Sequence, residues 1–251
     1  MGGTLKLQLM TWTEVEDYLA LSDGIVIPVG STEQHGPIGL IGTDALCAEA
    51  SAVGAAERAQ VIVAPTIALT PAPFNMHFPG TMSVSTSLFQ NLVSEVLAGL
   101  KQQGFGHFYF LNAHGANLAP LNRVAESDKK TPICIRSWWD FEPVNVLRRA
   151  FFGNWEGMHA TPSEVSITQA LHRIVPMHPA AKDPPRPLTD EFIQAHSGDR
   201  HGPPDQHRAA FPDGRVGAHS ALATPEYGQR ILEAAQTAVA ADMSRFFAQG
   251  E

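Results

Sequence analysis

The chain has 251 residues, 44% hydrophobic and 17% charged, a composition that excludes a disordered chain or a charged coiled coil. Its 17 Lys and Arg against 25 Asp and Glu give a net charge of -8, so the positive charge of a nucleic-acid binder is absent. No apolar run reaches the ~18 residues of a membrane span, and the two cysteines fit a reducing compartment. We expect a soluble cytoplasmic protein with no nucleic-acid or membrane partner, folded as a single domain over residues 1–251.

Short apolar runs alternate with longer helical patterns along the chain. Strands are expected at 25–29, 61–65, 107–111 and 133–135, and helices at 44–57, 87–103, 118–129 and 224–247. Because these strands are apolar on both faces and separated by helices, they predict an α/β fold with a parallel sheet covered on both sides. A further helix is expected near the N-terminus, where Thr13 and Glu16 form a capping-box pattern.

The stretch 197–220 is rich in Gly, Pro, His and Asp and shows no periodicity. A structureless segment of this length predicts a lid, an interface loop or disorder. Six histidines in helix or loop contexts are expected to be solvated: His172, His178, His196, His201, His207 and His219.

Carboxylates and imidazoles gather where predicted strands end or helices begin. They are Glu33, His35, Asp44, His114, His159 and Glu164. Open α/β folds place their sites at the carboxyl ends of the strands, and Glu33 and His35, two residues apart, point the same way in an extended segment. Such a set of ligands suits divalent Zn, Mn or Fe.

Each of these residues also has a structural interpretation. Asp44 fits a helix N-terminus with Thr43 as its cap, Glu164 fits a capping box with Thr161, and His114 fits a strand end. Chance is a poor explanation for three separate segments that all carry residues able to bind a metal, so we favour the metal site.

Three motifs together resemble the creatininase (creatinine amidohydrolase) family. They are Gly30-Ser31-Thr32-Glu33-Gln34-His35-Gly36-Pro37 followed by Gly42-Thr43-Asp44, then Asn112-Ala113-His114-Gly115-Ala116-Asn117, and His159 with Glu164 five residues on. The resemblance implies a three-layer α/β/α sandwich with a mostly parallel central sheet. It also implies a hydrolase with two divalent metal ions per chain (Zn, Mn or Fe), and a homo-oligomer, since family members often form hexamers.

By motif position, Glu33, Asp44 and His114 would hold one ion, and His35 with Asp44 would hold the other. Creatininase completes the second site with a glutamate at the position of Ala116, so Glu164 is the candidate here. Each ligating histidine would need its second ring nitrogen held by a carboxylate or a carbonyl.

The resemblance also suggests the catalytic and substrate-binding residues. His159, which would shuttle the proton, and Glu164 are the catalytic candidates. Trp155 would form a wall for a planar amide or serve as a core aromatic. Apart from the resemblance, His77 follows the second expected strand and would line the pocket or lie at the surface. Gly115 replaces a substrate-pocket tyrosine of creatininase, which argues against creatinine as the substrate.

The function expected from these residues is metal-dependent hydrolysis of a small-molecule amide, at a cyclic amide or another non-peptide C–N bond. Two alternatives from the same family remain open: a formamide deformylase and a peptidase that trims a small peptide. A third alternative, from a different class, is a non-catalytic binding protein.

Overall fold

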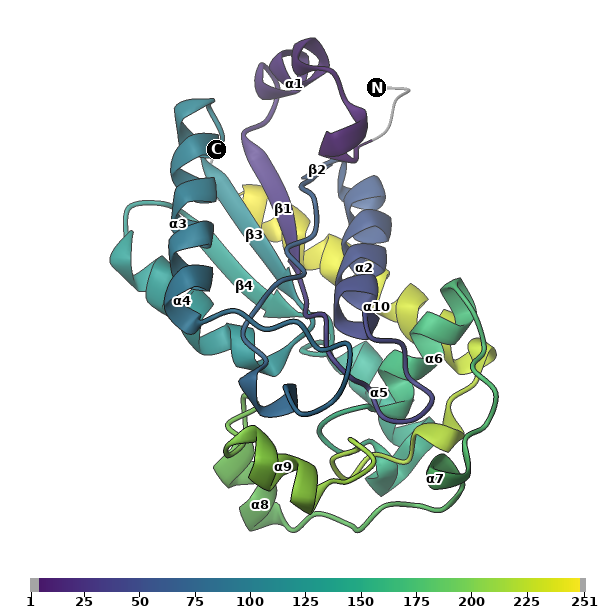
Figure 1. Ribbon diagram of the computed structural model, residues 1–251. Helices are drawn as coiled ribbons and strands as arrows, with labels where there is room; N and C mark the ends of the chain where they lie inside the picture. Colours follow the sequence, from purple (N-terminus) through teal and green to yellow (C-terminus); the bar gives the residue numbers. More distant parts are fainter. Residues whose placement is uncertain (1–4, 249–251) are drawn as a thin grey trace.

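A parallel four-stranded sheet lies at the centre of the structure, a computed structural model in which residues 5–248 are described (Figure 1). Its strands are β1 (Gly24–Val29), β2 (Ile62–Val63), β3 (His107–Asn112) and β4 (Ile133–Ser137). They are all parallel and lie in the order β2-β1-β3-β4. The chain moves from β1 to β2 on one side and then to β3 on the other, so the boundary of β1 and β3 is the switch point where such sheets bind ligands.

Helices lie on both faces of this sheet. The α-helices are α1 (Trp12–Leu19), α2 (Thr43–Ala59), α3 (Thr86–Gln102), α4 (Leu118–Ser127), α5 (Glu142–Phe152), α6 (Pro162–Leu171), α7 (Pro179–Lys182), α8 (Asp190–His196), α9 (Pro204–Ala210) and α10 (Pro225–Phe247). Short 3-10 helices are η1 (Leu7–Leu9), η2 (Pro73–Asn75), η3 (Gly115–Asn117), η4 (Gly153–Trp155) and η5 (Ser220–Leu222).

Two buried clusters, one on each face of the sheet, make up the core. Successive side chains of a strand point to opposite faces, so Ile25 and Ile27 pack with residues of α1, α3 and α4. Val26 faces the other way and packs with residues of α2, α5, α6 and α10. The expected α/β fold, a helix–sheet–helix sandwich with a parallel sheet, is confirmed.

Near the N-terminus, the expected helix is present but its expected cap is wrong. The cap is Thr11, whose side chain accepts the Glu14 N–H while the Glu14 carboxylate accepts the Thr11 N–H at 2.7 Å. Two Thr-x-x-Glu patterns overlap in this stretch, and the sequence alone favoured the second. Starting the helix at Trp12 places Tyr18 in the core.

The expectation of a structureless stretch at 197–220 is also wrong. It contains α9, and both His207 and Arg215 are buried. The expectation that His207 is solvated is therefore wrong. The buried face of α9 is an imidazole ring rather than an aliphatic side chain, and for this reason the segment shows no hydrophobic period. Pro204 takes the first helical position, where its missing N–H costs nothing.

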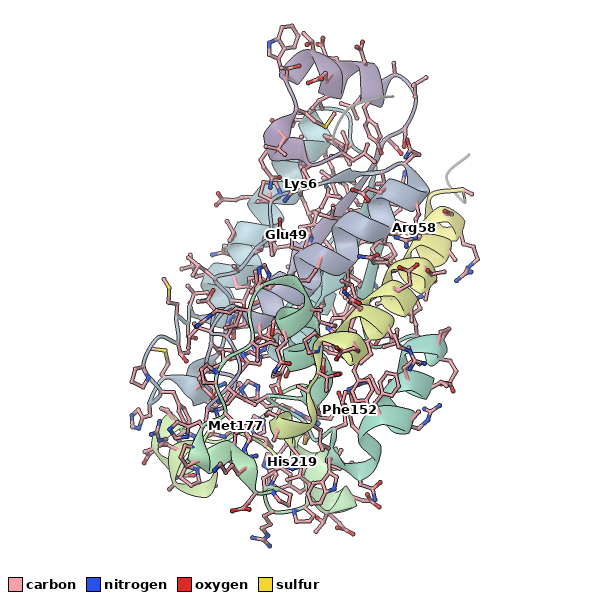
Figure 2. The ribbon with its side chains drawn as sticks, turned by 90° about the vertical axis from the view of Figure 1, so that its right-hand side faces the viewer. Lys6, Glu49, Arg58, Phe152, Met177 and His219 are labelled. Atoms are coloured by element: carbon pink, nitrogen blue, oxygen red, sulfur yellow. The ribbon has the colours of Figure 1, made fainter. Side chains whose placement is uncertain are left out.

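The outer helices are tied to one another and to the N-terminal segment. Figure 2 shows α2 and α10 side by side. Arg58 of α2 pairs with Glu233 of α10 at 2.9 Å. Lys6 pairs with Glu49 of α2 at 2.5 Å. In the part of the chain that the structure describes, no helix is both long and apolar enough to cross a bilayer.

Helix α10 packs on α6 at a glycine. A Cβ built on Gly228 would lie 2.0 Å from the carbonyl oxygen of Ser166, so the two helices approach as closely as their backbones allow.

We expect Gly228→Ala to lower the free energy of unfolding by about 1–3 kcal/mol, because the new methyl group must push the helices apart. Gly99→Ala is the matched control: it lies in α3 with no atom within 4 Å of a built Cβ, and should stabilise the protein by about 0.4–1 kcal/mol. Urea denaturation of both variants measures the difference. Equal stabilities would contradict the close approach of α6 and α10.

Candidate metal centre

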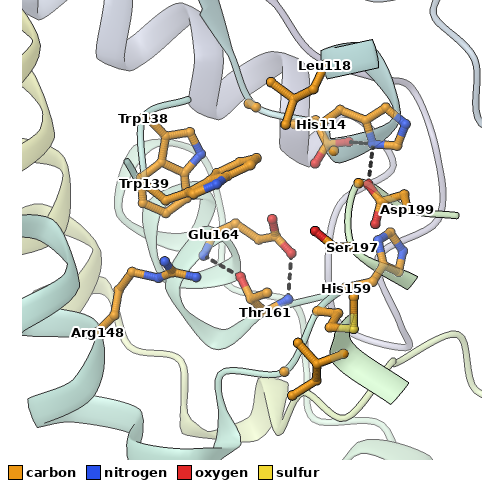
Figure 3. Close-up of a pocket in the computed structure, with 17 residues that line it drawn as sticks. His114, Leu118, Trp138, Trp139, Arg148, His159, Thr161, Glu164, Ser197 and Asp199 are labelled. Atoms are coloured by element: carbon orange, nitrogen blue, oxygen red, sulfur yellow. Dashed lines mark hydrogen bonds and ion pairs between the residues drawn. The ribbon is translucent and has the colours of Figure 1, made fainter. Parts of the chain in front are cut away.

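A cavity of about 250 Å³ opens at the carboxyl ends of β3 and β4, between α6 and the segment around α8 (Figure 3). Its lining includes Asp44, His114, Gly115, Leu118, Trp138, Trp139, Arg148, Met158, His159, Thr161, Glu164, Ile193, Ser197, Gly198 and Asp199. In Figure 3 the tryptophans and Arg148 lie on one side, His114, His159 and Asp199 lie on the other, and Glu164 lies between them.

The first group of possible ligands comprises Glu33, Asp44 and His114, all of them buried. The Nδ1 atom of His114 lies 3.3 Å from Glu33 Oε1 and 3.3 Å from Asp44 Oδ2. Both of these carboxylate oxygens are buried, and neither accepts a hydrogen bond within the described residues. Buried oxygens without a donor are costly unless something positive lies between them.

The remaining polar atoms of this group are fixed by neighbours. Asn75 donates to Glu33 Oε2 at 3.1 Å, and His114 donates from Nε2 to the Pro71 carbonyl at 2.9 Å. Each side chain is therefore held by one atom while another points to a shared space. A carbonyl on the second imidazole nitrogen is the arrangement typical of a histidine that binds metal.

A second group, His35, Asp44 and Glu164, shares Asp44 with the first. The Nε2 atom of His35 lies 2.8 Å from Asp44 Oδ1 and 3.9 Å from Glu164 Oε1. The other ring nitrogen of His35 contacts the Glu33 carbonyl at 3.1 Å, so His35 is anchored in the same way as His114.

Burial and neighbouring charges compete at this centre. Burial opposes protonation of His35, but the neighbouring carboxylates, Asp44 before Glu164 and Glu33, together outweigh it and raise the pKa of His35 to about 10. Burial opposes ionisation of Asp44, yet the neighbouring imidazoles hold its pKa below the ordinary value. Burial raises the pKa of Glu164 to about 7. Without a cation, protons on the imidazoles balance part of this buried negative charge.

Glu164 forms the capping box that the sequence suggested, and it also belongs to the second group of possible ligands. It closes a capping box at the start of α6, where its Oε1 accepts the Thr161 N–H at 2.5 Å and its own N–H bonds the Thr161 hydroxyl at 3.3 Å. Its Oε2 accepts no hydrogen bond from the described residues.

For Asp44, the expected cap is wrong: Gly42 occupies the N-cap position of α2, and the Thr43 hydroxyl donates to the Leu40 carbonyl instead.

His159 is buried and forms a third group of possible ligands with Glu33 and His35. Its Nε2 contacts the Gln34 carbonyl at 2.7 Å, and its Nδ1 lies 3.5 Å from Glu33 Oε1. Burial lowers the pKa of His159, so the ring is neutral at neutral pH. With Nε2–H donated to Gln34, the lone pair of Nδ1 faces the carboxylates.

These donor sets fit divalent cations. Two carboxylates and an imidazole form the first set, and Asp44 with His35 and Glu164 form the second, which is the mixed N/O chemistry that first-row metals accept. The unbonded oxygens of Glu33 and Asp44 supply the lone pairs that such an ion needs.

Not every residue expected at the site lies there. Gly115 lines the cavity as expected. Trp155 instead packs edge-on against His219, with ring centroids 6.0 Å apart, and is not among the residues that line the cavity. His77 is exposed and also lies outside the lining, because the turn after η2 points it to solvent.

The sequence did not single out three residues that line the cavity: Trp138, Trp139 and Asp199. Arg148 also lines the cavity; its side chain is mostly buried and pairs with Glu156 at 3.0 Å. The two tryptophans follow β4 directly, and that position could have identified them. Asp199 had no comparable signal, since an Asp after a Gly is typical of any turn.

The sequence profile of the creatininase family, described as creatinine amidohydrolase, matches residues 8–243. The chain belongs to the creatininase family. The crystal structure of creatinine amidohydrolase (creatininase) superposes with a TM-score of 0.76 at 22% identity, covering 98% of this chain and 99% of that one. This likeness confirms the fold.

The curated relatives within the family have different named activities. The creatinine amidohydrolase of Pseudomonas putida is 28% identical over 205 residues, 70% of this chain and 77% of that protein. The 3-dehydro-scyllo-inosose hydrolase of Thermotoga maritima is 35% identical over 65% of this chain and 55% of its own length. The mycofactocin precursor peptide peptidase of Mycolicibacterium smegmatis is 34% identical over 39% of this chain and 41% of its own length.

The two roles of Glu164 can be separated with Glu164→Gln, which keeps an acceptor for the Thr161 N–H but removes the charge. A glutamine also completes a capping box, so we expect the metal-free variant to unfold within about 0.5 kcal/mol of the original protein. Its affinity for Zn²⁺ should fall at least about tenfold, as measured by competition with a chelator. Thr161→Ala is the converse control: it should cost about 1 kcal/mol of stability and leave the affinity for Zn²⁺ unchanged. An unchanged affinity in Glu164→Gln would leave Glu164 with the capping role alone.

Proposed function

We propose that this protein is a two-metal amidohydrolase that cleaves a cyclic amide or another non-peptide C–N bond in a small molecule. The observation that carries the proposal is the convergence of two ligand groups on Asp44, one of them with buried carboxylate oxygens that lack hydrogen-bond donors. Membership of a family whose matched relatives are named hydrolases supports it.

In this proposal, Glu33, Asp44 and His114 hold one cation, and His35, Asp44 and Glu164 hold the other. A pair of divalent cations supplies a nucleophile at neutral pH and polarises the scissile carbonyl. Asp44 spans the two groups through separate oxygens, Oδ1 toward His35 and Oδ2 toward His114. Related structures entitled "Creatininase Mn" and "Zn-Zn type" creatininase support manganese or zinc as the metal.

His159 is the proton carrier in this scheme. A neutral imidazole that donates from Nε2 to Gln34 has Nδ1 free to take up a proton beside Glu33. It can then deliver that proton to the nitrogen that leaves, which would otherwise depart as a poor anionic group. The Gln34 carbonyl holds the ring in the orientation that this transfer needs.

The opposite side of the cavity is the proposed substrate wall. Trp138 is buried, and its Nε1–H has no acceptor among the described residues, so it can donate to a bound substrate. Trp139 packs edge-on against it at 5.5 Å between centroids. The substrate proposed for the space between these aromatics and the carboxylates is a flat, polar ring or amide.

We also propose that the protein is cytoplasmic and forms a homo-oligomer. Both cysteines are free thiols, which supports a reducing compartment. Large apolar side chains near the N-terminal helix are exposed: Leu9 at 63%, Trp12 at 73% and Leu21 at 77%. Exposed apolar surface of this kind supports a contact between copies.

Asp44→Ala should remove both cations and all turnover, because both ligand groups lose a shared member. Metal analysis after dialysis should give about two equivalents of Zn or Mn for the original protein and almost none for the variant. Glu57→Ala, an exposed change on the same helix, is the control and should keep both. A variant that still binds two equivalents would refute the assignment of Asp44.

A substrate panel tests the reaction class. We expect the metal-loaded protein to hydrolyse lactams, hydantoin-like rings or small formamides, with product release followed by mass spectrometry, and Asp44→Ala to hydrolyse none. The cavity of about 250 Å³ suits a small molecule rather than a peptide chain. Preference for short peptides or for 3-dehydro-scyllo-inosose would contradict the proposal, and two bound cations without turnover of any compound would favour a binding protein.

A further inference from the structure

Asp199 belongs to none of the three ligand groups, yet it contacts the first of them. Its Oδ2 lies 3.7 Å from His114 Nδ1 and accepts the Ala116 N–H at 3.1 Å. The side chain is only 10% exposed. A buried carboxylate thus lies against the ring nitrogen that also faces Glu33 and Asp44.

The backbone at Asp199 adopts a conformation that few side chains tolerate. Its φ is +53°, and the preceding Gly198 has a φ of +73°. A left-handed conformation in a residue other than glycine costs free energy and persists where the surroundings impose it, often at ligand clamps. Here it turns the carboxylate into the cavity.

The opposite wall is shaped to receive this carboxylate. A Cβ built on Gly115 would lie 2.4 Å from Asp199 Oδ2, so any larger residue at this position would displace it. Gly115 therefore contributes to the site by the space it leaves free.

Aromatic packing holds the segment that carries Asp199 in place. The rings of His201 and His207 lie 4.8 and 5.1 Å from that of Phe74 in η2. The next residue, Asn75, donates to Glu33. The same short helix thus positions both a ligand of the first group and the segment that brings Asp199 to it.

We propose that Asp199 is a further carboxylate of the metal centre, supplied by the segment between α8 and α9, which strengthens cation binding at Glu33, Asp44 and His114. This inference rests on the proposed function. Asp199 lies outside the set of atoms close enough to share one ion, so it acts as a positioning residue: its charge attracts the cation and fixes the edge of the first site beside His114 and Ala116.

Asp199→Asn tests this role, because it keeps the size and an acceptor for the Ala116 N–H but removes the charge. We expect one of the two Zn²⁺ equivalents to bind about 10- to 100-fold more weakly, and the other to bind as before. Affinities are measured on metal-stripped protein by chelator competition. The melting temperature of the metal-free protein should not change. Asp205→Asn, an exposed change in the first turn of α9, is the matched control and should alter neither affinity.

A second variant approaches the same contact from the other wall. Gly115→Ala should displace the carboxylate and weaken the same equivalent, and the double variant with Asp199→Asn should lose no more than either single change, because both remove one interaction. Wild-type affinity in Asp199→Asn, or an equal loss at both sites with a lower melting temperature, would overturn the inference and leave Asp199 as a backbone cap. Absence of Zn²⁺ binding in the unaltered protein would instead overturn the proposed function.

Discussion

Burial of carboxylates at a single point is the constraint on which the rest of this structure depends. Glu33, Asp44, Glu164 and Asp199 all lie there with little exposure, and a cluster of buried like charges is unfavourable unless positive charge compensates it. The imidazoles supply part of that compensation when they carry protons, and divalent cations can supply it more fully. This constraint explains why a hydrogen bond holds one atom of Glu33, His114 and Glu164. Without these bonds, the like-charged carboxylates would turn away from one another.

The fold satisfies the constraint by bringing helix starts and strand ends to one edge of the sheet. His114 follows β3 at the switch point, while Asp44 and Glu164 lie in the first turns of α2 and α6. The partial positive charge at a helix N-terminus favours a carboxylate in that position. The backbone therefore offsets some of the cost of burying these acids before any cation binds, and this leaves the site organised to receive one.

Features encoded by neighbouring residues could be predicted from the sequence, and those that depend on distant contacts could not. The strands, the long helices and the strand-end position of His114 follow from apolar runs and turn residues close in the chain. Asp199 could not be found in this way, since the residues that its carboxylate contacts, His114 and Ala116, lie far away in the sequence, Ala116 by 83 residues. For His77 and Trp155 the sequence left two positions open each, and only the structure separates them: His77 lies at the surface and Trp155 packs against His219, both outside the cavity lining.

Glu164 shows why structural and functional interpretations of one residue need not exclude each other. A carboxylate has two oxygens, and the capping box uses only Oε1. The cap fixes the side chain in one rotamer, and that fixed rotamer is what a ligand requires, because an immobile donor loses less entropy when a cation binds. Asn75 gives Glu33 the same kind of support through Oε2. In this centre, the hydrogen bonds that stabilise the fold also fix the side chains that we propose as ligands.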